Sequence, residues 1–545
     1  MCRQDRCVAL GRENRQGSFD DVLLLVGDHL PEGSIYRLLA EHGAALFGDD
    51  YFADLFKRSA LGRPTVPARV VATVMLLQAY EGLSDREACD RLAFDLRWKA
   101  AAGLTVDAAA FHPTVLVGMR NRLRASDRPR RLFDDVNATA AAAGLLRGRR
   151  RVLDSTPLFD AVATQDTVIQ LRAAIRRVLS ATDRADPALA GAVRAALTRD
   201  DDYASVGKPP CDWDDPKARE ALVDALVKDA QAALAALDGH ELAGSAGEAA
   251  ELLALVAGQD VEAGEDGIFR IARRVARDRL ISTVDVQARH GHKSRARTFD
   301  GYKSHLAVDP DEELITGVAV TPANTADREV IDELLNQHGA DTPADTESGA
   351  DEYGGNGSES KDFEVYGDSA YADGATLDEQ TARGHDMRAK VPPVRNANGF
   401  SKDRFTIDLA VGTVTCPAHH TVAIRAGLRH RVARFGARCG SCPLRADCTK
   451  SRRGRMISIH PHEAALQHAK TRQRDPGWQQ DYRTYRPVVE RKISHFTRRP
   501  WGGRNARCRG HKRILTDILA RAGAINLARL ATLGLHHAAT GWAIA

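Results

Sequence analysis

Three acidic residues lie in short contexts that together suggest one site, although they are far apart along the chain. Asp154 and Asp368 each fall in or just after a short apolar run, where we expect strands. Glu490 lies in the run 486–492, where we expect a late helix. Carboxylates arranged in this way can hold a pair of divalent cations, which clamp the attacking and leaving oxygens of a phosphodiester. Mg²⁺ suits such a site because it prefers oxygen ligands and keeps several waters.

The distribution of charge supports a nucleic-acid substrate better than the net charge does. The net charge is only +4, but residues 120–151 carry ten arginines against three aspartates. Residues 483–513 carry eleven Lys or Arg against one acid, Glu490. For either run alone, a solvated protein surface is an equally good interpretation. Two such runs, each beside a candidate acid, favour contact with phosphates.

Basic residues around Glu490 are the first candidates for DNA binding. Arg486 lies one turn before Glu490 and is placed to contact a phosphate near the bond that is cut. A track giving salt-sensitive affinity is expected from Arg491, Lys492, Arg498 and Arg499. Trp501 beside them either stacks on a base or packs in the protein.

A second set of candidates lies in the expected strand 301–309. Lys303 and His305 alternate on one face of this strand. If that face looks toward the site, both side chains contact phosphate. The alternative is that they lie on an exposed face of a hairpin.

Length and composition place the chain among ordinary globular proteins. At 545 residues we expect two or three domains, and the hydrophobic content of 43% is typical. No run of about 18 apolar residues occurs, so no membrane span is expected. The first residues form no apolar signal core, which favours a cytoplasmic protein.

Four of the nine cysteines are grouped in a pattern that suits a metal. Cys439 and Cys442 are followed closely by Cys448, and Cys416 stands upstream. Four thiolates at such spacing suit structural Zn²⁺ in tetrahedral coordination. His419 or His420 could replace one thiolate, and buried thiols without metal are the alternative. The other cysteines stand apart, so nothing marks them as ligands.

The N-terminal region reads as helical. Pro67 to Tyr80 predicts a helix with proline at its start, and Ser84 with Glu87 predicts a capping box for the next helix, to about Phe94. This pair is either a DNA-binding helix-turn-helix or a packed helical hairpin. A further helix is expected over about 113–124.

The middle of the chain predicts an α/β domain with a helical insertion. Strands are expected at Asp154, at 301–309 with an antiparallel partner at 314–320, at 363–368 and at 388–391. Helices are expected over 172–179, 216–237 and 246–256, within a segment too long for a loop. The acidic stretch 339–362 is expected to be a disordered loop. Further helices are expected at 327–335, 375–383 and in 487–533.

The order of these motifs resembles that of the DDE transposases of bacterial insertion sequences. Helices 62–87 resemble the helical N-terminal domain of one large branch, and residues 321–327 match a segment common after the third strand of the family. The resemblance covers roughly 50–160 and 285–535. It implies a ribonuclease-H-like mixed sheet in an α/β fold, with an all-α N-terminal domain and a small zinc-ribbon-like insertion.

The resemblance also implies the site and the reaction. Asp154, Asp368 and Glu490 would bind two Mg²⁺ ions, with Mn²⁺ as a substitute, and cut and transfer DNA strands. The partners would be double-stranded DNA, at the transposon ends (terminal inverted repeats) and at the target, and a second copy of the chain. Family members with a cysteine-bearing insertion carry a pattern like that of Cys416, Cys439, Cys442 and Cys448.

Three positions around Glu490 depart from the family signature. The position of its tyrosine holds Arg483, flanked by Tyr482 and Tyr485, and the position of its lysine holds Thr497. Pro487 suggests that the helix starts near residue 487.

The resulting domain prediction has four parts. They are an N-terminal DNA-binding domain (18–147), a catalytic domain (148–164, 281–398 and 476–535), a helical insertion (165–280) and a cysteine-containing insertion (399–475). Two alternatives to a transposase remain open from sequence. One is a nuclease of the same fold that cuts without joining, and the other is an inactive, transposase-derived DNA-binding protein.

Overall fold

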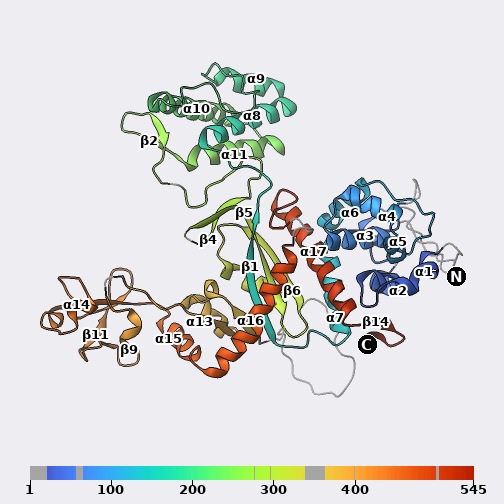
Figure 1. The fold of residues 1–545 in the computed structure, drawn as a ribbon. Coiled ribbons are helices and arrows are strands. Elements are labelled where there is room, and N and C mark those ends of the chain that lie inside the picture. Colours follow the sequence, from blue (N-terminus) through green and yellow to red (C-terminus); the bar gives the residue numbers. More distant parts are fainter. Residues whose placement is uncertain are drawn as a thin grey trace, which may run out of the picture.

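The computed structural model describes residues 21–48, 50–56, 65–274, 276–294, 296–337, 362–397, 399–498 and 503–545. A mixed α/β body stands at the centre, with N-terminal helices on one side, a cysteine-bearing sheet on the other and a helical insertion at one end of the central sheet (Figure 1). The predicted loop 339–362 lies outside the described residues except for Asp362, and Arg499 and Trp501 also lie outside. Within the described ranges, no helix is long and apolar enough to cross a membrane.

The N-terminal region is all helical, as predicted. Its helices are α1 (Val22–Val26), α2 (Ile35–Leu46), α3 (Ala68–Glu81), α4 (Asp85–Phe94), α5 (Leu96–Ala102), α6 (Thr114–Ala125) and α7 (Arg131–Ala142). Pro67 caps α3, and Ser84 with Glu87 forms the predicted capping box of α4. Gly82 links α3 to α4 in the left-handed conformation at φ 72°, which glycine adopts without strain.

The central sheet is mixed. Strand β1 (Arg150–Phe159) pairs antiparallel with β5 (Arg297–Asp309) and parallel with β7 (Glu364–Gly367), which pairs parallel with β8 (Asp386–Ala389). Strands β4 (Arg289–Ser294) and β6 (Leu314–Pro322) both pair antiparallel with β5. The predicted strands are therefore present, and β4 is an addition that the sequence pattern did not reveal.

Helices cover both faces of this sheet. On one face, α16 (Pro476–Phe496) and α17 (His511–Thr532) bury apolar side chains against β1, β5 and β6. On the other, α12 (Ile331–Asn336), α13 (Gly374–Ala382) and α15 (Glu463–Arg472) pack on β1, β6, β7 and β8. Burial of apolar side chains on both faces explains why β6 reads as a continuous apolar run rather than an alternating one.

Helix α16 corrects one prediction. It begins at Pro476, not near Pro487, and Pro487 lies inside it. Asp475 caps this start by accepting from the amide of Trp478 at 2.8 Å. The sequence argument gave too much weight to a proline inside a helix, because packing of Tyr482 and Val489 in the core stabilises the helix on both sides of it.

The N-terminal helices are joined to the sheet through α17. Asn526 is fully buried and donates to the carbonyl of Ile315 in β6 and to Oδ1 of Asn137 in α7, at 2.7 and 2.8 Å. Its Oδ1 accepts from the amide of Ile315 at 2.8 Å. A C-terminal hairpin, β14 (Leu535–Ala538) and β15 (Gly541–Ile544), then packs near α2.

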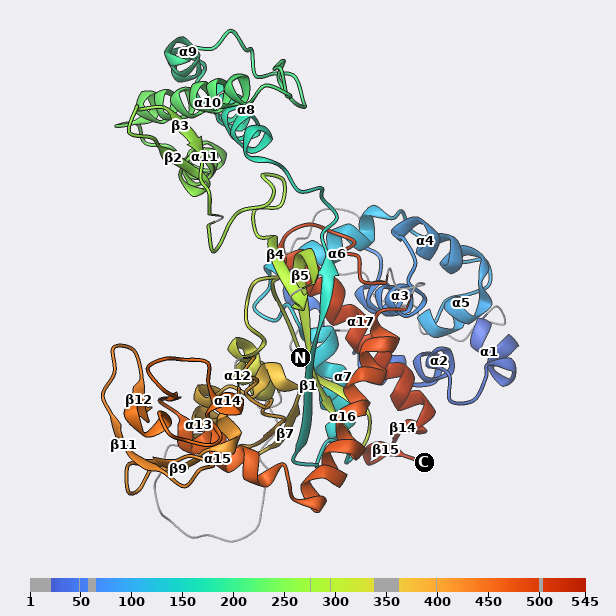
Figure 2. The same ribbon diagram turned by 60° about the vertical axis from the view of Figure 1, so that its left-hand side comes forward.

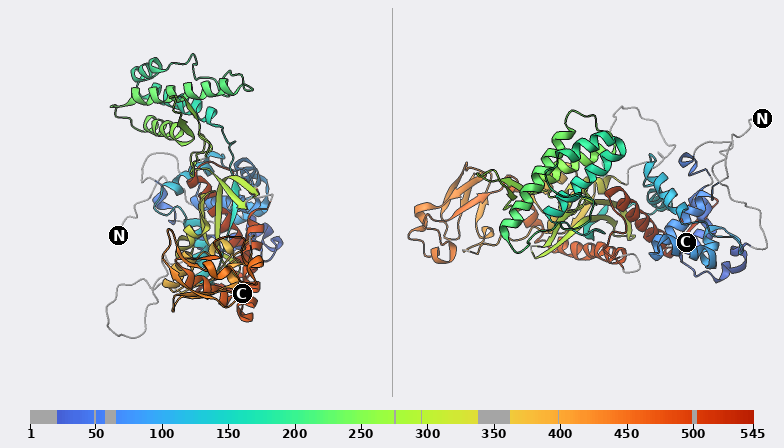
Figure 3. Two further views of the ribbon diagram at one scale, coloured as in Figure 1. Left: turned by 90° about the vertical axis from the view of Figure 1, so that its left-hand side faces the viewer. Right: turned by 90° about the horizontal axis from the view of Figure 1, so that it is seen from above.

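The insertion forms a unit with its own apolar core and stands off one end of the sheet (Figures 1 and 3). It contains α8 (Thr167–Ala185), α9 (Pro187–Ala196), α10 (Pro216–Leu237) and α11 (Ser245–Gln259), followed by a hairpin of β2 (Val261–Ala263) and β3 (Phe269–Ile271). The three predicted helices are confirmed, and α9 and the hairpin are additions.

The cysteine-bearing region is a small antiparallel sheet with its own apolar core. Its strands are β9 (Thr406–Asp408), β10 (Thr413–Thr415), β11 (Thr421–Arg425), β12 (Arg431–Arg434) and β13 (Met456–Ile459). They follow one another across the sheet in chain order. A short helix, α14 (Arg445–Cys448), lies between β12 and β13 in the chain. The cysteines lie in β-strand connections and in α14, at one end of this sheet.

Candidate active site

The three predicted acids line one cleft of about 640 Å³. Strands β1 and β7 are parallel neighbours in which Val152 pairs with Tyr366. Two residues beyond this pair, Asp154 in β1 stands level with Asp368, which directly follows β7. Glu490 reaches the same cleft from α16, which packs across β1. The sheet and one helix thus bring together side chains separated by more than three hundred positions.

The three acids differ in how they are held. Asp154 is mostly buried, with 17% of its side chain exposed, and its Oδ1 accepts from the amide of Ser155 at 2.8 Å. Asp368 caps a short 3-10 helix (Ser369–Tyr371) by accepting from the amide of Ala370 at 2.8 Å. Glu490 is 65% exposed. Two acids are therefore held by backbone amides, whereas most of the third side chain is exposed.

Arg486 lies between two of these acids. Its Nη2 donates to Oδ2 of Asp154 at 2.8 Å, and its Nη1 stands 3.6 Å from Oε1 of Glu490. The arginine is buried, with 9% of its side chain exposed. Burial raises the pKa of Asp154 above its ordinary value, and the positive charge of Arg486 limits the rise. The carboxylates of the cleft therefore already hold one positive group, the guanidinium of Arg486.

The oxygen donors of the cleft fit hard divalent cations. The carboxylates stand further apart than they would around a bound metal ion. Among the described residues, no three His, Cys, Asp or Glu side chains are grouped closely enough to hold a metal ion as they stand. The carboxylates nevertheless share a cleft, and a guanidinium stands against two of them. Oxygen donors of this kind are the ligands that Mg²⁺ prefers.

A fourth acid in the cleft, Asp327, was not singled out from the sequence. Its Oδ1 accepts from Nζ of Lys303 at 2.8 Å, and its Oδ2 accepts from the hydroxyl of Ser155 at 2.8 Å. Lys303 also donates to the carbonyl of Thr325 at 2.8 Å. The signal was present, because Asp327 ends the segment 321–327 that matched the family, but that match carried no role for it.

His305 does not lie where a DNA contact requires. It is fully buried beneath the sheet surface, and its ring Nε2 bonds to the hydroxyl of Thr321 at 2.8 Å. Burial lowers its pKa to about 4, so the ring is neutral at physiological pH. The predicted phosphate contact by His305 is therefore wrong, whereas Lys303 does line the cleft. The two side chains alternate along β5 as predicted, but only that of Lys303 reaches the cleft.

Lys492 also departs from its predicted role. Its side chain is only 4% exposed and forms an ion pair with Glu313 at 3.2 Å, so it faces the protein rather than DNA. Arg491 is 53% exposed, although it bonds to Glu313 at 2.8 Å. Arg498 is exposed at the end of α16. The helix has one inward and one outward face, and a basic run in sequence did not separate them.

The positions that depart from the family signature take defined places around the cleft. Tyr482 is buried and donates to the carbonyl of Gly367 at 2.9 Å, next to Asp368. Arg483 is exposed. Thr497 lines the cleft and donates to the carbonyl of Ile493 at 2.8 Å. A tyrosine therefore contacts the backbone beside Asp368, although Tyr482 stands one position from where the signature puts it.

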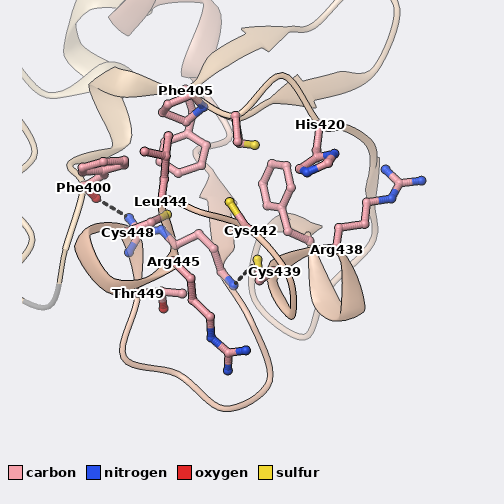
Figure 4. A pocket seen from close by; sticks show the side chains of 15 residues that line it. Phe400, Phe405, His420, Arg438, Cys439, Cys442, Leu444, Arg445, Cys448 and Thr449 are labelled. Atoms are coloured by element: carbon pink, nitrogen blue, oxygen red, sulfur yellow. Dashed lines mark hydrogen bonds between the residues drawn. The ribbon is translucent and has the colours of Figure 1, made fainter.

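The four clustered cysteines line one cavity in the small sheet, together with His420. Figure 4 shows the labelled Cys439, Cys442 and Cys448 around it. Burial raises the pKa of the Cys448 thiol, and the neighbouring Cys439 and Cys416 raise it further. The cysteines do not form a metal-holding group as they stand, within the part of the chain that the structure describes.

The fold and the cleft define an α/β protein with an acid-lined site bordered by basic side chains. Two family models match it. One, described as a transposase DDE domain, covers residues 415–531, and the other, described as a transposase domain (DUF772), covers residues 25–122. Together they indicate a DDE transposase of the insertion-sequence type. No curated protein and no solved structure matches the chain.

Proposed function

We propose that this protein binds the terminal inverted repeats of its insertion sequence and catalyses metal-dependent cleavage and strand transfer of DNA. The observation that carries the proposal is that Asp154, Asp368 and Glu490 line one cleft. Only Glu490 lies within the residues matched as a transposase DDE domain. The cleft therefore supplies an argument for the two aspartates that is independent of the family match.

The same proposal extends to the organisation of the chain. We assign the sheet with α16 and α17 as a ribonuclease-H-like catalytic domain, and helices α1 to α7 as a DNA-binding domain. Distinct apolar cores in the insertion and in the cysteine-bearing sheet support treating each of these as a separate unit. Catalysis at two transposon ends at once favours a homodimer on DNA.

Asp154, Asp368 and Glu490 would hold two Mg²⁺ ions, which when bound activate the attacking oxygen and stabilise the leaving oxygen of a phosphodiester. The fixed aspartates define the position of the site, and the exposed Glu490 closes on it from α16. Arg486 would exchange its contact with Asp154 for a phosphate oxygen of the substrate. Lys303, held by Asp327, would face the same phosphate region from the opposite side of the cleft.

The cysteine cavity supports a structural zinc site. Zinc would be held by Cys416, Cys439, Cys442 and Cys448, with His420 as the neighbour able to replace one thiolate. The amide of Arg455 donates to Sγ of Cys439 at 3.4 Å, as amides do toward thiolates. Gly454 beside it has φ 78°, and a Cβ there would stand 3.2 Å from that sulfur. The backbone is thus shaped closely around Cys439.

The decisive experiment uses Asp154→Ala, Asp368→Ala and Glu490→Ala in the full chain. Each is expected to abolish nicking of a supercoiled plasmid in Mg²⁺ or Mn²⁺ while leaving binding of duplex DNA unchanged. Glu379→Ala, which removes an exposed acid on α13, is the matched control and should cut normally. Metal-dependent cutting retained by Asp368→Ala would contradict the assignment.

A second assay separates a transposase from a nuclease. The protein is given a duplex whose 3′ end is already cut, together with a plasmid target, in Mg²⁺. Joined products are expected for a transposase, whereas cutting without joining supports the nuclease alternative. DNA binding with neither activity would support an inactive DNA-binding protein.

A further inference from the structure

Helix α6 presents a stripe of polar and small apolar residues to solvent and carries no acidic residue. Leu116, Met119 and Leu123 are its buried residues. The opposite stripe, at the three- and four-residue spacing of one helical face, contains Thr114, Val117, Asn121, Arg124 and Ala125. Val117 is 44% exposed there, and Asn121 is exposed. A helix with this surface is free to enter a groove of DNA.

The arginines of α6 have different surroundings. Arg120 forms an ion pair with Asp85, and its Nη1 donates to Oε1 of Gln78 at 3.3 Å. Arg122 lies over the ring of Phe56, 4.8 Å from its centroid. Arg124 donates to Oδ1 of Asn121 and has no ion pair within the described residues. Arg120 is therefore held by an ion pair, Arg122 is exposed but lies against Phe56, and Arg124 is half-buried beside the exposed Asn121.

Helix α4, the second helix of the predicted helix-turn-helix, is a poorer candidate for this role. Its exposed side chains include Arg86 and Arg91, but also the acids Glu87 and Asp90. Arg91 lies near Glu81 and Asp95, at 3.6 and 3.5 Å. Its partner α3 is buried along almost its whole length. The mixed charge of α4 gives little attraction to phosphates, whereas α6 is uniformly basic.

A basic segment, residues 504–513, lies beside α6 and leads to the acid-lined cleft. It runs past α6 between α16 and α17 (Figure 2). Arg513 is close enough to Arg124 to lower its pKa, after the larger effect of burial. Arg509, Lys512 and Arg513 are exposed, and none has an ion pair within the described residues. Arg504, at the other end of the segment, lines the cleft.

Positive side chains held together without carboxylate partners repel one another. A phosphate backbone laid across them would remove this repulsion and release its own counterions. The segment is also tied to both regions that it borders. Arg507 donates to the carbonyl of Leu83 at the α3–α4 turn, at 3.3 Å, and the amide of Phe159 in β1 donates to the carbonyl of Arg504 at 2.7 Å.

We propose that α6 reads base sequence in the major groove of a DNA duplex through Asn121 and Arg124, and that residues 504–513 hold the backbone of the same duplex and direct it to the cleft. The proposal rests on the proposed function, because it takes duplex DNA as the partner. Asparagine pairs geometrically with adenine and arginine with guanine in the major groove. The exposed methyl groups of Val117 add apolar contact of the kind that a thymine methyl makes.

The test uses the full chain and a library of DNA duplexes with a randomised centre. Bound duplexes are recovered and sequenced, for the wild type and for Asn121→Ala, Arg124→Ala and Arg124→Lys. The wild type is expected to enrich a short motif. Each α6 variant should lose preference by about tenfold at one or two adjacent base pairs of that motif. Arg124→Lys keeps the charge, so it should retain affinity for unselected DNA.

The backbone segment and α4 supply the contrasts. Lys512→Ala and Arg513→Ala should weaken binding to all sequences alike and lower the salt dependence by about one counterion each. Arg86→Ala, which removes an exposed arginine from α4, should leave the preferred motif unchanged. Circular dichroism of each variant checks that it is folded.

The outcomes separate this inference from the proposed function. If the wild type enriches no motif, or if the α6 variants keep the wild-type motif, the assignment of α6 is wrong, whether or not the protein cuts DNA. A change of motif in Arg86→Ala with none in Arg124→Ala would move the reading role to α4. Failure to bind any duplex would overturn the proposed function as well.

Discussion

Arg486 donates to Asp154 at 2.8 Å, so a cationic side chain from α16 is held against a mostly buried acid of the cleft. The same guanidinium stands 3.6 Å from Glu490, one turn further along the helix. A single arginine therefore balances two of the three acids that would hold metal. The guanidinium of Arg486 and a metal ion from solution would therefore compete for the same carboxylates.

Removing this arginine is expected to change metal binding and cutting in opposite directions. In Arg486→Ala the carboxylates face one another without a balancing charge, so Mn²⁺ should bind about tenfold more tightly, equivalent to about 1.4 kcal/mol. Cutting should fall, because the phosphate loses its partner. Titration calorimetry with Mn²⁺ in the absence of DNA measures the first effect. Arg483→Ala, which changes an exposed residue on the same helix, is the control and should bind Mn²⁺ as the wild type does. If Arg486→Ala also binds Mn²⁺ with wild-type affinity, the interpretation is contradicted.

Asp327→Asn tests whether the fourth acid orients the cleft. The substitution keeps the size of the side chain but removes the charge that pairs with Lys303, so the lysine is held less firmly, chiefly by the carbonyl of Thr325. We expect plasmid cutting to fall about 10- to 100-fold, as for other partners of metal-site residues, with little change in DNA affinity. Glu333→Gln, at an exposed position of α12, should cut normally. A variant that cuts at the wild-type rate would show that Asp327 has only a structural role.

Removal of a clustered cysteine should release zinc. The purified wild type is expected to contain about one equivalent of zinc, and Cys439→Ser much less, because three thiolates hold the ion more weakly. Elemental analysis measures both, and Cys211→Ser in the insertion is the control. Less than about half an equivalent in the wild type would favour the alternative of buried thiols without metal.

Asn526→Leu should destabilise the junction between α17, α7 and β6. The substitution removes both hydrogen bonds to the backbone of Ile315 and leaves these buried groups unpaired. The free energy of unfolding is expected to fall by roughly 3 kcal/mol. Urea unfolding followed by circular dichroism measures this, with Asn336→Leu at an exposed position as the control. A change below about 0.5 kcal/mol would mean that water or repacking replaces the lost bonds.

Asp160 predicts a pH dependence of stability. Burial, and next the charge of Asp285, raise its pKa from 3.8 to about 6. The folded state therefore binds more protons than the unfolded state between these values, and stability falls as pH rises through this window. Asp160→Asn should remove this loss and add roughly 1 kcal/mol at neutral pH, after allowance for solvent screening. Urea unfolding at acidic and neutral pH checks the sign, and a variant less stable than the wild type at neutral pH would refute it.

The strands and long helices could be predicted because their patterns are local. The apolar run of β6, the capping box at Ser84 and the helix of 216–237 all depend on neighbouring residues in the sequence. The start of α16 could not be predicted in the same way. There a local rule about Pro487 conflicted with tertiary packing on both sides of it, and packing prevailed.

The acids of the cleft were predictable for a different reason, which is that each stands in a recognisable context. The direction of a side chain was not predictable. His305 and Lys492 are basic residues in basic or strand-like surroundings, and only the packed structure shows that both face inward. Asp327 was missed because its partners are distant in sequence: Ser155 lies in β1 and Lys303 in β5.

The two ends of the helical insertion meet at Gln165. Its amide donates to the carbonyl of Ile281 at 2.9 Å, and its side chain accepts from the amide of Thr283 at 2.8 Å. The chain thus leaves the sheet after β1 and returns beside the point where it left, at Ile281 and Thr283. The insertion is consequently a side branch, so that changes in its length or sequence need not alter the spacing of the strands that carry the acids.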